Sequence, residues 1–219
     1  MIKLVIFDMD GVLTSTTHEH FSAWASLFKH HFNLEIDPLL EVKTKGVSRL
    51  ESLKVLLDHY GIDINESARL SLAQEKNIAY QQLIAQFDES KCLPGVIECL
   101  EVLKRRKILC ALGSASKNGP FLLKAIKLEK YFDYVVDPTL LRSKPYPDIF
   151  LKAASHFGIS PQDCLGIEDA EAGIEAIKRA GMFAIGIGPE QLNQADLKVK
   201  TFPEISQKLW DEILRGKKE

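Results

Sequence analysis

Residues 3–14 read Lys-Leu-Val-Ile-Phe-Asp-Met-Asp-Gly-Val-Leu-Thr, and this stretch decides the fold. Its first part is a continuous apolar run, which is typical of a central strand in a parallel sheet that is covered on both faces. The run stops at Asp8 and Asp10, and Gly11 then permits a sharp turn. Open α/β sheets bind ligands at the carboxyl ends of their strands, so the two carboxylates predict a site at this end.

Asp8 and Asp10 suit two different roles in phosphoryl transfer. A carboxylate beside a bound cation can attack phosphorus, because the cation offsets repulsion from the phosphoryl oxygens. In an extended segment the second carboxylate lies about 7 Å away on the same side of the chain. It can therefore handle the proton of the attacking or leaving hydroxyl group. The alternative for this segment is a turn in which both aspartates cap backbone amides.

The composition limits the partners that we expect. The 219 residues include 28 basic and 30 acidic side chains, so no global charge favours nucleic acid or an anionic membrane surface. No apolar run approaches the roughly 20 residues that span a bilayer, and the start of the chain has no signal-peptide pattern. We therefore expect a cytoplasmic protein with no nucleic-acid or membrane partner. The scattered cysteines are interpreted as reduced thiols, mostly in the core: Cys92, Cys99, Cys110 and Cys164.

A long helical region follows the first strand. Apolar residues at spacings of three and four predict a first helix around residues 20–32, and further helices are predicted over 49–60 and 66–87. A simple βαβ crossover needs only about a dozen residues. We therefore predict a separate α-helical cap domain at 15–87, inserted into a core formed by 1–14 and 88–219. Within it, Trp24 and the leucine stripe are most simply explained as the packing core of the cap.

Beyond residue 93 the pattern alternates regularly between helices and strands. Helices are predicted over 96–106, 120–126, 148–157 and 170–180, and strands over 108–112, 134–136, 164–167 and 182–187. This alternation predicts an α/β fold with a doubly wound parallel sheet and right-handed crossovers. We expect the strand order 3-2-1-4-5, which places the first strand where the strand order reverses and the other strand ends near Asp8.

Two more strand ends carry polar side chains. The second strand is followed by Ser114, Ser116 and Asn118 before a helix, where amide groups and the helix dipole favour an anion. The local alternative is that Ser116 and Asn118 only cap that helix. The fourth strand ends at Glu168 and Asp169, whose mutual repulsion favours a bound cation unless they cap the next helix. Hard oxygen ligands in small number, with phosphate completing the shell, indicate Mg²⁺.

These motifs together resemble those of the haloacid dehalogenase superfamily of phosphotransferases. Phe-Asp-Met-Asp-Gly-Val-Leu-Thr resembles the first motif, which implies that Asp8 carries the phosphoryl group and Asp10 is the general acid and base. Ser114 matches the residue that hydrogen-bonds the phosphoryl group, and Lys144 matches the lysine that balances charge beside the nucleophile. The resemblance implies Mg²⁺ held by Asp8, Glu168, Asp169 and the backbone carbonyl of Asp10.

The cap adds a second set of candidate residues. Lys-Gly-Val-Ser-Arg at 45–49 precedes a helix, where backbone amides and a guanidinium group could hold a second phosphate. The cap resembles that of the sugar-phosphate mutases in the superfamily, which implies a small hexose phosphate substrate and a monomer. Arg49 would then hold the non-reacting phosphate, and His20 would couple cap closure to the placement of Asp10. The substrate-binding set implied by this resemblance is His20, Trp24, Gly46, Val47, Arg49, Ser52, Lys76, Ser116, Lys117 and Asn118.

Two positions depart from the family pattern, and two other functions compete with the mutase. Ser15 stands where an aspartate is expected and Gly113 where an alanine is expected, which affects the hinge and the phosphate loop. A hydrolase would use the same core with water as the attacking group, and the four motifs do not separate it from a mutase. A receiver-type signalling module also phosphorylates an aspartate on a parallel sheet. The inserted helices and Asp10 argue against it, since a switch needs neither a substrate cover nor a positioned acid.

Overall fold

The core of the computed structural model is a six-stranded parallel sheet. The structure describes residues 1–188 and 192–215. The strand order is β3-β2-β1-β4-β5-β6, so β1 lies in the middle between β2 and β4. The strands are β1 (Leu4–Phe7), β2 (Leu109–Leu112), β3 (Tyr134–Val135), β4 (Cys164–Glu168), β5 (Phe183–Ile187) and β6 (Leu197–Val199).

The predicted fold class and the order of the first five strands are confirmed, but the sequence prediction missed β6. This strand has only three residues, of which Lys198 is exposed, so it shows neither a long apolar run nor a clear alternation. It pairs with β5 at the edge of the sheet. The backbone of Asp196 bonds to Ala184, and its carboxylate accepts from the Ala184 amide at 2.7 Å, which fixes the start of β6 against β5.

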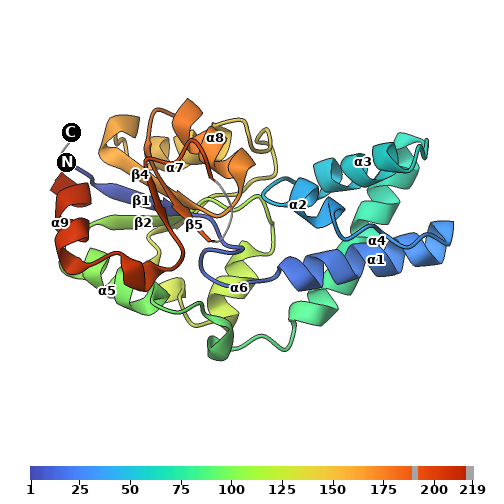
Figure 1. Cartoon of the computed structure of the whole chain (residues 1–219), viewed down its shortest axis with the longest axis horizontal. Helices are drawn as coiled ribbons and strands as arrows, with labels where there is room; N and C mark the ends of the chain where they lie inside the picture. Colours follow the sequence, from blue (N-terminus) through green and yellow to red (C-terminus); the bar gives the residue numbers. More distant parts are fainter. Residues whose placement is uncertain (189–191, 216–219) are drawn as a thin grey trace.

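Helices cover both faces of the sheet (Figure 1). On one face, Val5 and Phe7 pack with the apolar sides of α5 (Val96–Arg105), α6 (Gly119–Ala125) and α9 (Gln207–Arg215). On the other face, Leu4 and Ile6 pack with α7 (Asp148–His156) and α8 (Glu171–Arg179). Alternate residues of β1 therefore enter two different cores, which explains why its sequence is apolar without interruption.

Four helices are inserted between β1 and α5 and lie beyond one end of the sheet in Figure 1. They are α1 (Thr17–Phe32), α2 (Leu40–Thr44), α3 (Arg49–His59) and α4 (Glu66–Ile84). Trp24, Phe28, Leu53 and Leu56 form the centre of their shared core. The short helix α2 was not predicted, because five residues are too few to show a helical period.

Polar residues set the ends of these helices. The hydroxyl of Ser48 accepts from the amide of Glu51 at the start of α3, and the side chain of Asn65 accepts from the amide of Ala68 at the start of α4. Helix α1 ends at Asn33, which adopts the left-handed conformation with φ of 52°.

The cysteine prediction is confirmed, since all four thiols are free and three are buried. Within residues 1–188 and 192–215, no helix combines the length and the apolar character that a membrane crossing requires.

The central strand should dominate the stability of the core. Ile6 is fully buried between β1 and the helices α7 and α8, so Ile6→Ala leaves a cavity. We expect a loss of about 2–5 kcal/mol in the free energy of unfolding, measured by urea titration. The same substitution at Ile78, which is 51% exposed on α4, is the matched control and should change it by no more than about 0.5 kcal/mol. Equal losses in both variants would contradict the central position of β1.

Candidate active site

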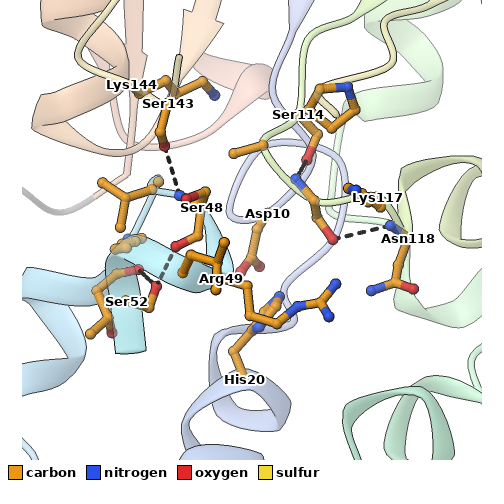
Figure 2. Close-up of a pocket in the computed structure, with 18 of the residues that line it drawn as sticks. Asp10, His20, Ser48, Arg49, Ser52, Ser114, Lys117, Asn118, Ser143 and Lys144 are labelled. Atoms are coloured by element: carbon orange, nitrogen blue, oxygen red, sulfur yellow. Dashed lines mark hydrogen bonds between the residues drawn. The ribbon is translucent and has the colours of Figure 1, made fainter. Parts of the chain in front are cut away.

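A cleft of about 600 Å³ lies between the carboxyl ends of the strands and the inserted helices. Figure 2 shows that side chains from both parts surround it, among them Asp10, Ser114 and Lys144 from the core and His20 and Arg49 from the cap helices. All of the predicted site residues line this cleft except Glu168, whose side chain is fully buried behind it. The fold therefore brings together residues as far apart in the sequence as Asp8 and Asp169.

Lys144 joins the ends of β1 and β4. Its ammonium group lies 2.6 Å from Asp8 Oδ1 and 2.6 Å from Glu168 Oε1, and all three side chains are buried. Burial alone would lower the pKa of Lys144, but Asp8 and Glu168 outweigh it, so this pKa lies above its usual value and the lysine stays charged. The paired strands place Asp8 and Glu168 side by side, because Phe7 is in register with Ile167.

Asp8, Glu168 and Asp169 form an acidic cluster whose ligand oxygens lie within 4.8 Å of one another. Burial raises the pKa of Asp169 well above its usual value, and the charge of Glu168 raises it further. The raised pKa shows that the crowded carboxylates favour added positive charge, which a bound cation would supply, and carboxylate oxygens are the donors that hard divalent cations prefer. The residues present fit such a cation.

Both carboxylate oxygens of Glu168 have partners within the protein. One carboxylate oxygen bonds to Lys144, and the other accepts from the backbone amides of Asp169 and Ala170, both at 2.8 Å. Gly173 permits this packing, since a Cβ atom there would lie only 1.9 Å from Glu168 Oε1. Glu168 therefore fixes the turn after β4 and orients Lys144, and the more open carboxylate of this turn is that of Asp169.

The carboxyl group of Asp10 is fixed beside the nucleophile candidate. Its Oδ1 accepts from the amide of Thr16 at 2.6 Å, and its own amide donates to Asp8 Oδ2 at 3.0 Å. Burial raises the pKa of Asp10 to about 6; the hydrogen bond from Thr16 acts in the opposite direction and the charge of Asp8 in the same direction. A carboxyl group with this pKa can both accept and donate a proton near neutral pH.

His20 and Lys76 connect two cap helices at the cleft. His20 Nδ1 lies 2.6 Å from the ammonium group of Lys76, and the imidazole ring stacks on Tyr80 with centroids 3.9 Å apart. Burial lowers the pKa of His20 well below its usual value, and Lys76 lowers it further, so His20 is neutral and Nδ1 accepts from Lys76. Burial and the charge of Arg49 lower the pKa of Lys76 to about 7. Trp24 lies against Lys76, with the ammonium 5.0 Å from its ring centroid.

The loop after β2 folds on its own hydroxyl groups. Ser114 Oγ accepts from the amide of Ser116, and Ser116 Oγ accepts from the amide of Asn118. The side chain of Asn118 does not cap α6; it accepts from Gln81 at 3.0 Å and donates to Asn77 at 3.0 Å, both on α4. Neither Ser116 nor Asn118 caps α6 through its side chain: Ser116 accepts from the amide of Asn118 before the helix begins, and Asn118 connects the core loop to the cap.

The loop before α3 also touches the core. The amide of Ser48 donates to Ser143 Oγ at 2.7 Å, and Lys45 Nζ lies 2.9 Å from Asp169 Oδ2. Gly46, with φ of +73°, approaches so closely that a Cβ atom there would lie 2.9 Å from Ala170 Cβ. The hydroxyl of Ser52 donates to the carbonyls of Thr44 and Ser48, so it braces this loop from within.

Sequence reasoning missed two residues that position the site, since Thr16 holds Asp10 and Gln81 holds Asn118. Neither a motif nor a period marks them, because each acts through a partner that is distant or on an irregular loop. Ser143 stands beside Lys144 in the third motif, but its contact with the amide of Ser48 was not predicted. The departure at Gly113 has a local explanation, since a Cβ atom there would lie 2.9 Å from Ile6 Cγ2.

Comparison with known proteins places this architecture in a family. The model of the haloacid dehalogenase-like hydrolase family matches residues 2–181. A β-phosphoglucomutase of Bacillus subtilis is 41% identical over 215 residues, which cover 96% of this chain and 95% of that protein. A fructose-1-phosphate phosphatase of Escherichia coli is 31% identical over 184 residues, which cover 84% of this chain and 95% of that protein. The crystal structure of a β-phosphoglucomutase from Clostridium difficile matches with a TM-score of 0.93 at 36% identity, over 98% of both chains. The chain therefore belongs to the haloacid dehalogenase-like hydrolase family.

Proposed function

We propose that the protein acts as a β-phosphoglucomutase, which interconverts β-D-glucose 1-phosphate and glucose 6-phosphate through an aspartyl-phosphate enzyme and glucose 1,6-bisphosphate. The observation that carries this proposal is the 41% identity to such an enzyme along 96% of the chain, including the inserted helices. The cleft supports it, because Arg49 lines the same cavity as Asp8 and offers a second phosphate position. We further propose that residues 15–87 act as a cap domain over a core of 1–14 and 88–219.

In this proposal Asp8 is the nucleophile. Lys144 stays protonated at 2.6 Å from its carboxylate and offsets the charge that accumulates when a phosphoryl group approaches. We propose that Asp8, Asp169, Glu168 and the carbonyl of Asp10 hold Mg²⁺, which would reduce the repulsion between carboxylate and phosphoryl oxygens. Ser114, which lines the cleft beside Asp8, would donate its hydroxyl to a phosphoryl oxygen.

Asp10 is proposed as the general acid and base. It would take the proton from the 6-hydroxyl of β-glucose 1-phosphate while that oxygen bonds to phosphorus and the bond from phosphorus to Asp8 breaks. The bisphosphate then turns around and returns its 1-phosphoryl group to Asp8, while Asp10 gives its proton to the departing C1 oxygen. The pKa of about 6 and the fixed bond to Thr16 support this double role.

The two ends of the substrate must exchange places, so the cleft must bind phosphate at both ends. Arg49 and the loop of Gly46 and Val47 would hold the non-reacting phosphate, and Ser116 and Asn118 would contact the reacting side, with Lys117 between them in the lining of the cleft. Three other residues of the predicted substrate-binding set already contact cap residues, which supports a role in shaping the cleft: Trp24, Ser52 and Lys76. A monomeric, cytoplasmic enzyme remains our prediction from the sequence.

The contacts between cap and core supply the means to exclude water from the phosphorylated aspartate. Asn118 meets Asn77 and Gln81, and Ser48 meets Ser143, so hydrogen bonds cross the cleft boundary at both edges. Water exclusion separates a mutase from a phosphatase with the same core. The relationship to a sugar-phosphate phosphatase makes hydrolysis the second candidate function.

Product analysis tests the proposal directly. The protein, incubated with Mg²⁺, β-glucose 1-phosphate and a trace of glucose 1,6-bisphosphate, should produce glucose 6-phosphate, because the sugar hydroxyl and not water receives the phosphoryl group. Enzymatic assays of glucose 6-phosphate and of inorganic phosphate measure the two outcomes. The α-anomer is the control and should react poorly. Inorganic phosphate as the main product from the β-anomer would favour the hydrolase.

Substitutions of Asp8 and of Asp10 should impair different steps of the reaction. Asp8→Asn should abolish turnover and prevent phosphorylation by acetyl phosphate, because no nucleophile remains. Asp10→Ala should slow turnover about 10²- to 10⁴-fold. It should still accept phosphate from acetyl phosphate, whose acetate leaving group needs no proton. Mass spectrometry of the intact protein detects the phosphorylated form, and equal loss of this form in both variants would contradict the separate roles.

Gln81 tests whether the link from α4 to Asn118 keeps water out. Gln81→Ala removes one bond to Asn118, worth about 1 kcal/mol or roughly fivefold in closure. We expect a higher KM for the sugar phosphate and a larger share of inorganic phosphate among the products. Gln82→Ala, at the exposed neighbouring position, is the matched control. An unchanged product ratio in Gln81→Ala would show that this link does not serve closure.

A further inference from the structure

We propose that His30, His31 and Glu75 form a binding site on the cap surface for a divalent transition-metal cation of the Zn²⁺ type. His30 and His31 lie in the last turn of α1, and Glu75 lies on the neighbouring helix α4. Each residue offers one ligand atom, and the three atoms lie within 4.8 Å of one another. This proposal does not rest on the proposed enzymatic function.

The geometry brings a second imidazole to an existing contact. His31 Nε2 lies 2.9 Å and 3.0 Å from the two carboxylate oxygens of Glu75. The ring of His30 stands edge-on to that of His31, with centroids 4.8 Å apart and planes at 84°. An exposed ion pair between His31 and Glu75 would contribute only about 0–1 kcal/mol, and it would not involve His30. The convergence of two imidazoles on one carboxylate is the feature that indicates a cation.

The donor set selects the class of cation. Two histidines and one glutamate can bind Zn²⁺ and leave a fourth position for water. Ligand atoms around a tetrahedral Zn²⁺ lie about 3.4 Å apart, given bonds of about 2.1 Å. Side-chain rotation can bring the ligand atoms, which lie within 4.8 Å of one another, to this shorter spacing, because the side chains of His31 and Glu75 are 33% and 48% exposed. Mg²⁺ prefers oxygen ligands and should bind poorly here.

The surroundings also favour a cation. The unpaired carbonyl groups at the C-terminal end of α1 carry partial negative charge. Lys29 is the neighbouring cation on α1, and its ammonium group pairs with Glu35 at 2.7 Å. All three ligand residues are exposed, so a cation reaches them without any opening of the cap.

The site is separate from the catalytic cleft. His31 follows His20 by 11 residues on the same helix, which corresponds to about 16 Å along its axis. Figure 1 shows α1 running from the sheet toward the far end of the cap beside α4. A cation at this point would join the two helices that carry His20 and Lys76, and would stabilise their packing. Since it would bind the folded form, it should raise the melting temperature.

Calorimetric titration of Zn²⁺ into the full-length protein, with Mg²⁺ in excess to occupy the acidic cluster of the cleft, tests the site. We expect one equivalent of Zn²⁺ to bind and the melting temperature to rise. His31→Gln and Glu75→Gln should each weaken binding by at least about tenfold, since the loss of even an outer-shell partner costs that much. His59→Gln changes another exposed cap histidine and is the matched control. The proposal fails if wild-type protein binds no Zn²⁺ in excess Mg²⁺, or if His59→Gln weakens binding as much as the two site variants.

Electron paramagnetic resonance of bound Cu²⁺ identifies the ligands independently of affinity. The wild-type spectrum should show coupling to two imidazole nitrogens, and His30→Gln should reduce this to one. The spectrum of His59→Gln should match the wild type. Coupling that is absent in the wild type, or unchanged in His30→Gln, would overturn the assignment.

Discussion

The ammonium group of Lys144 holds the carboxyl ends of β1 and β4 together. Three carboxylates, those of Asp8, Glu168 and Asp169, gather where β1 and β4 end, and burial removes the water that would otherwise screen their repulsion. Lys144 bonds to two of them at 2.6 Å. Removal of one member of a buried ionic network typically costs about 3–5 kcal/mol, because the remaining charges lose their partner. The arrangement of the strand ends therefore depends on a lysine from a loop that belongs to neither strand.

The carboxylates that Lys144 stabilises also attract further positive charge. Asp169 retains a raised pKa even with Lys45 at 2.9 Å, so the cluster still favours additional positive charge. Asp10 lies just outside this group, and the amide of Thr16 holds its carboxyl group in a position of its own. The core can thus support phosphoryl transfer to water or to a sugar, and both activities occur among its relatives. In the proposed function, the inserted helices decide between the two by the exclusion of water.

The inserted helices meet the core through directed polar contacts at the cleft and through apolar packing, since Ala23, Tyr80 and Ile84 share a buried cluster with β1. Asn118 on the core turns its amide toward α4, while Ser48 and Lys45 on the cap reach Ser143 and Asp169. Each hydrogen bond of this kind contributes only about 1 kcal/mol, so the polar contacts at the cleft can break and form again at modest cost. A substrate that must turn around between two half-reactions needs such a reversible boundary.

Local patterns in the sequence were enough to predict the parallel core, the inserted helices and the acidic strand ends. β1 is apolar throughout because both of its faces are buried, and a βαβ crossover needs only about a dozen residues, far fewer than stand between β1 and α5. The packing of the folded chain was needed to show that Glu168 binds Lys144, that Asn118 contacts Gln81, that β6 extends the sheet, and that His30 and His31 lie near Glu75. Each of these contacts joins residues far apart in the chain or on short, irregular segments. Such residues can be identified in the sequence, but their contact partners cannot. The distance between two of them depends on how whole helices and strands pack.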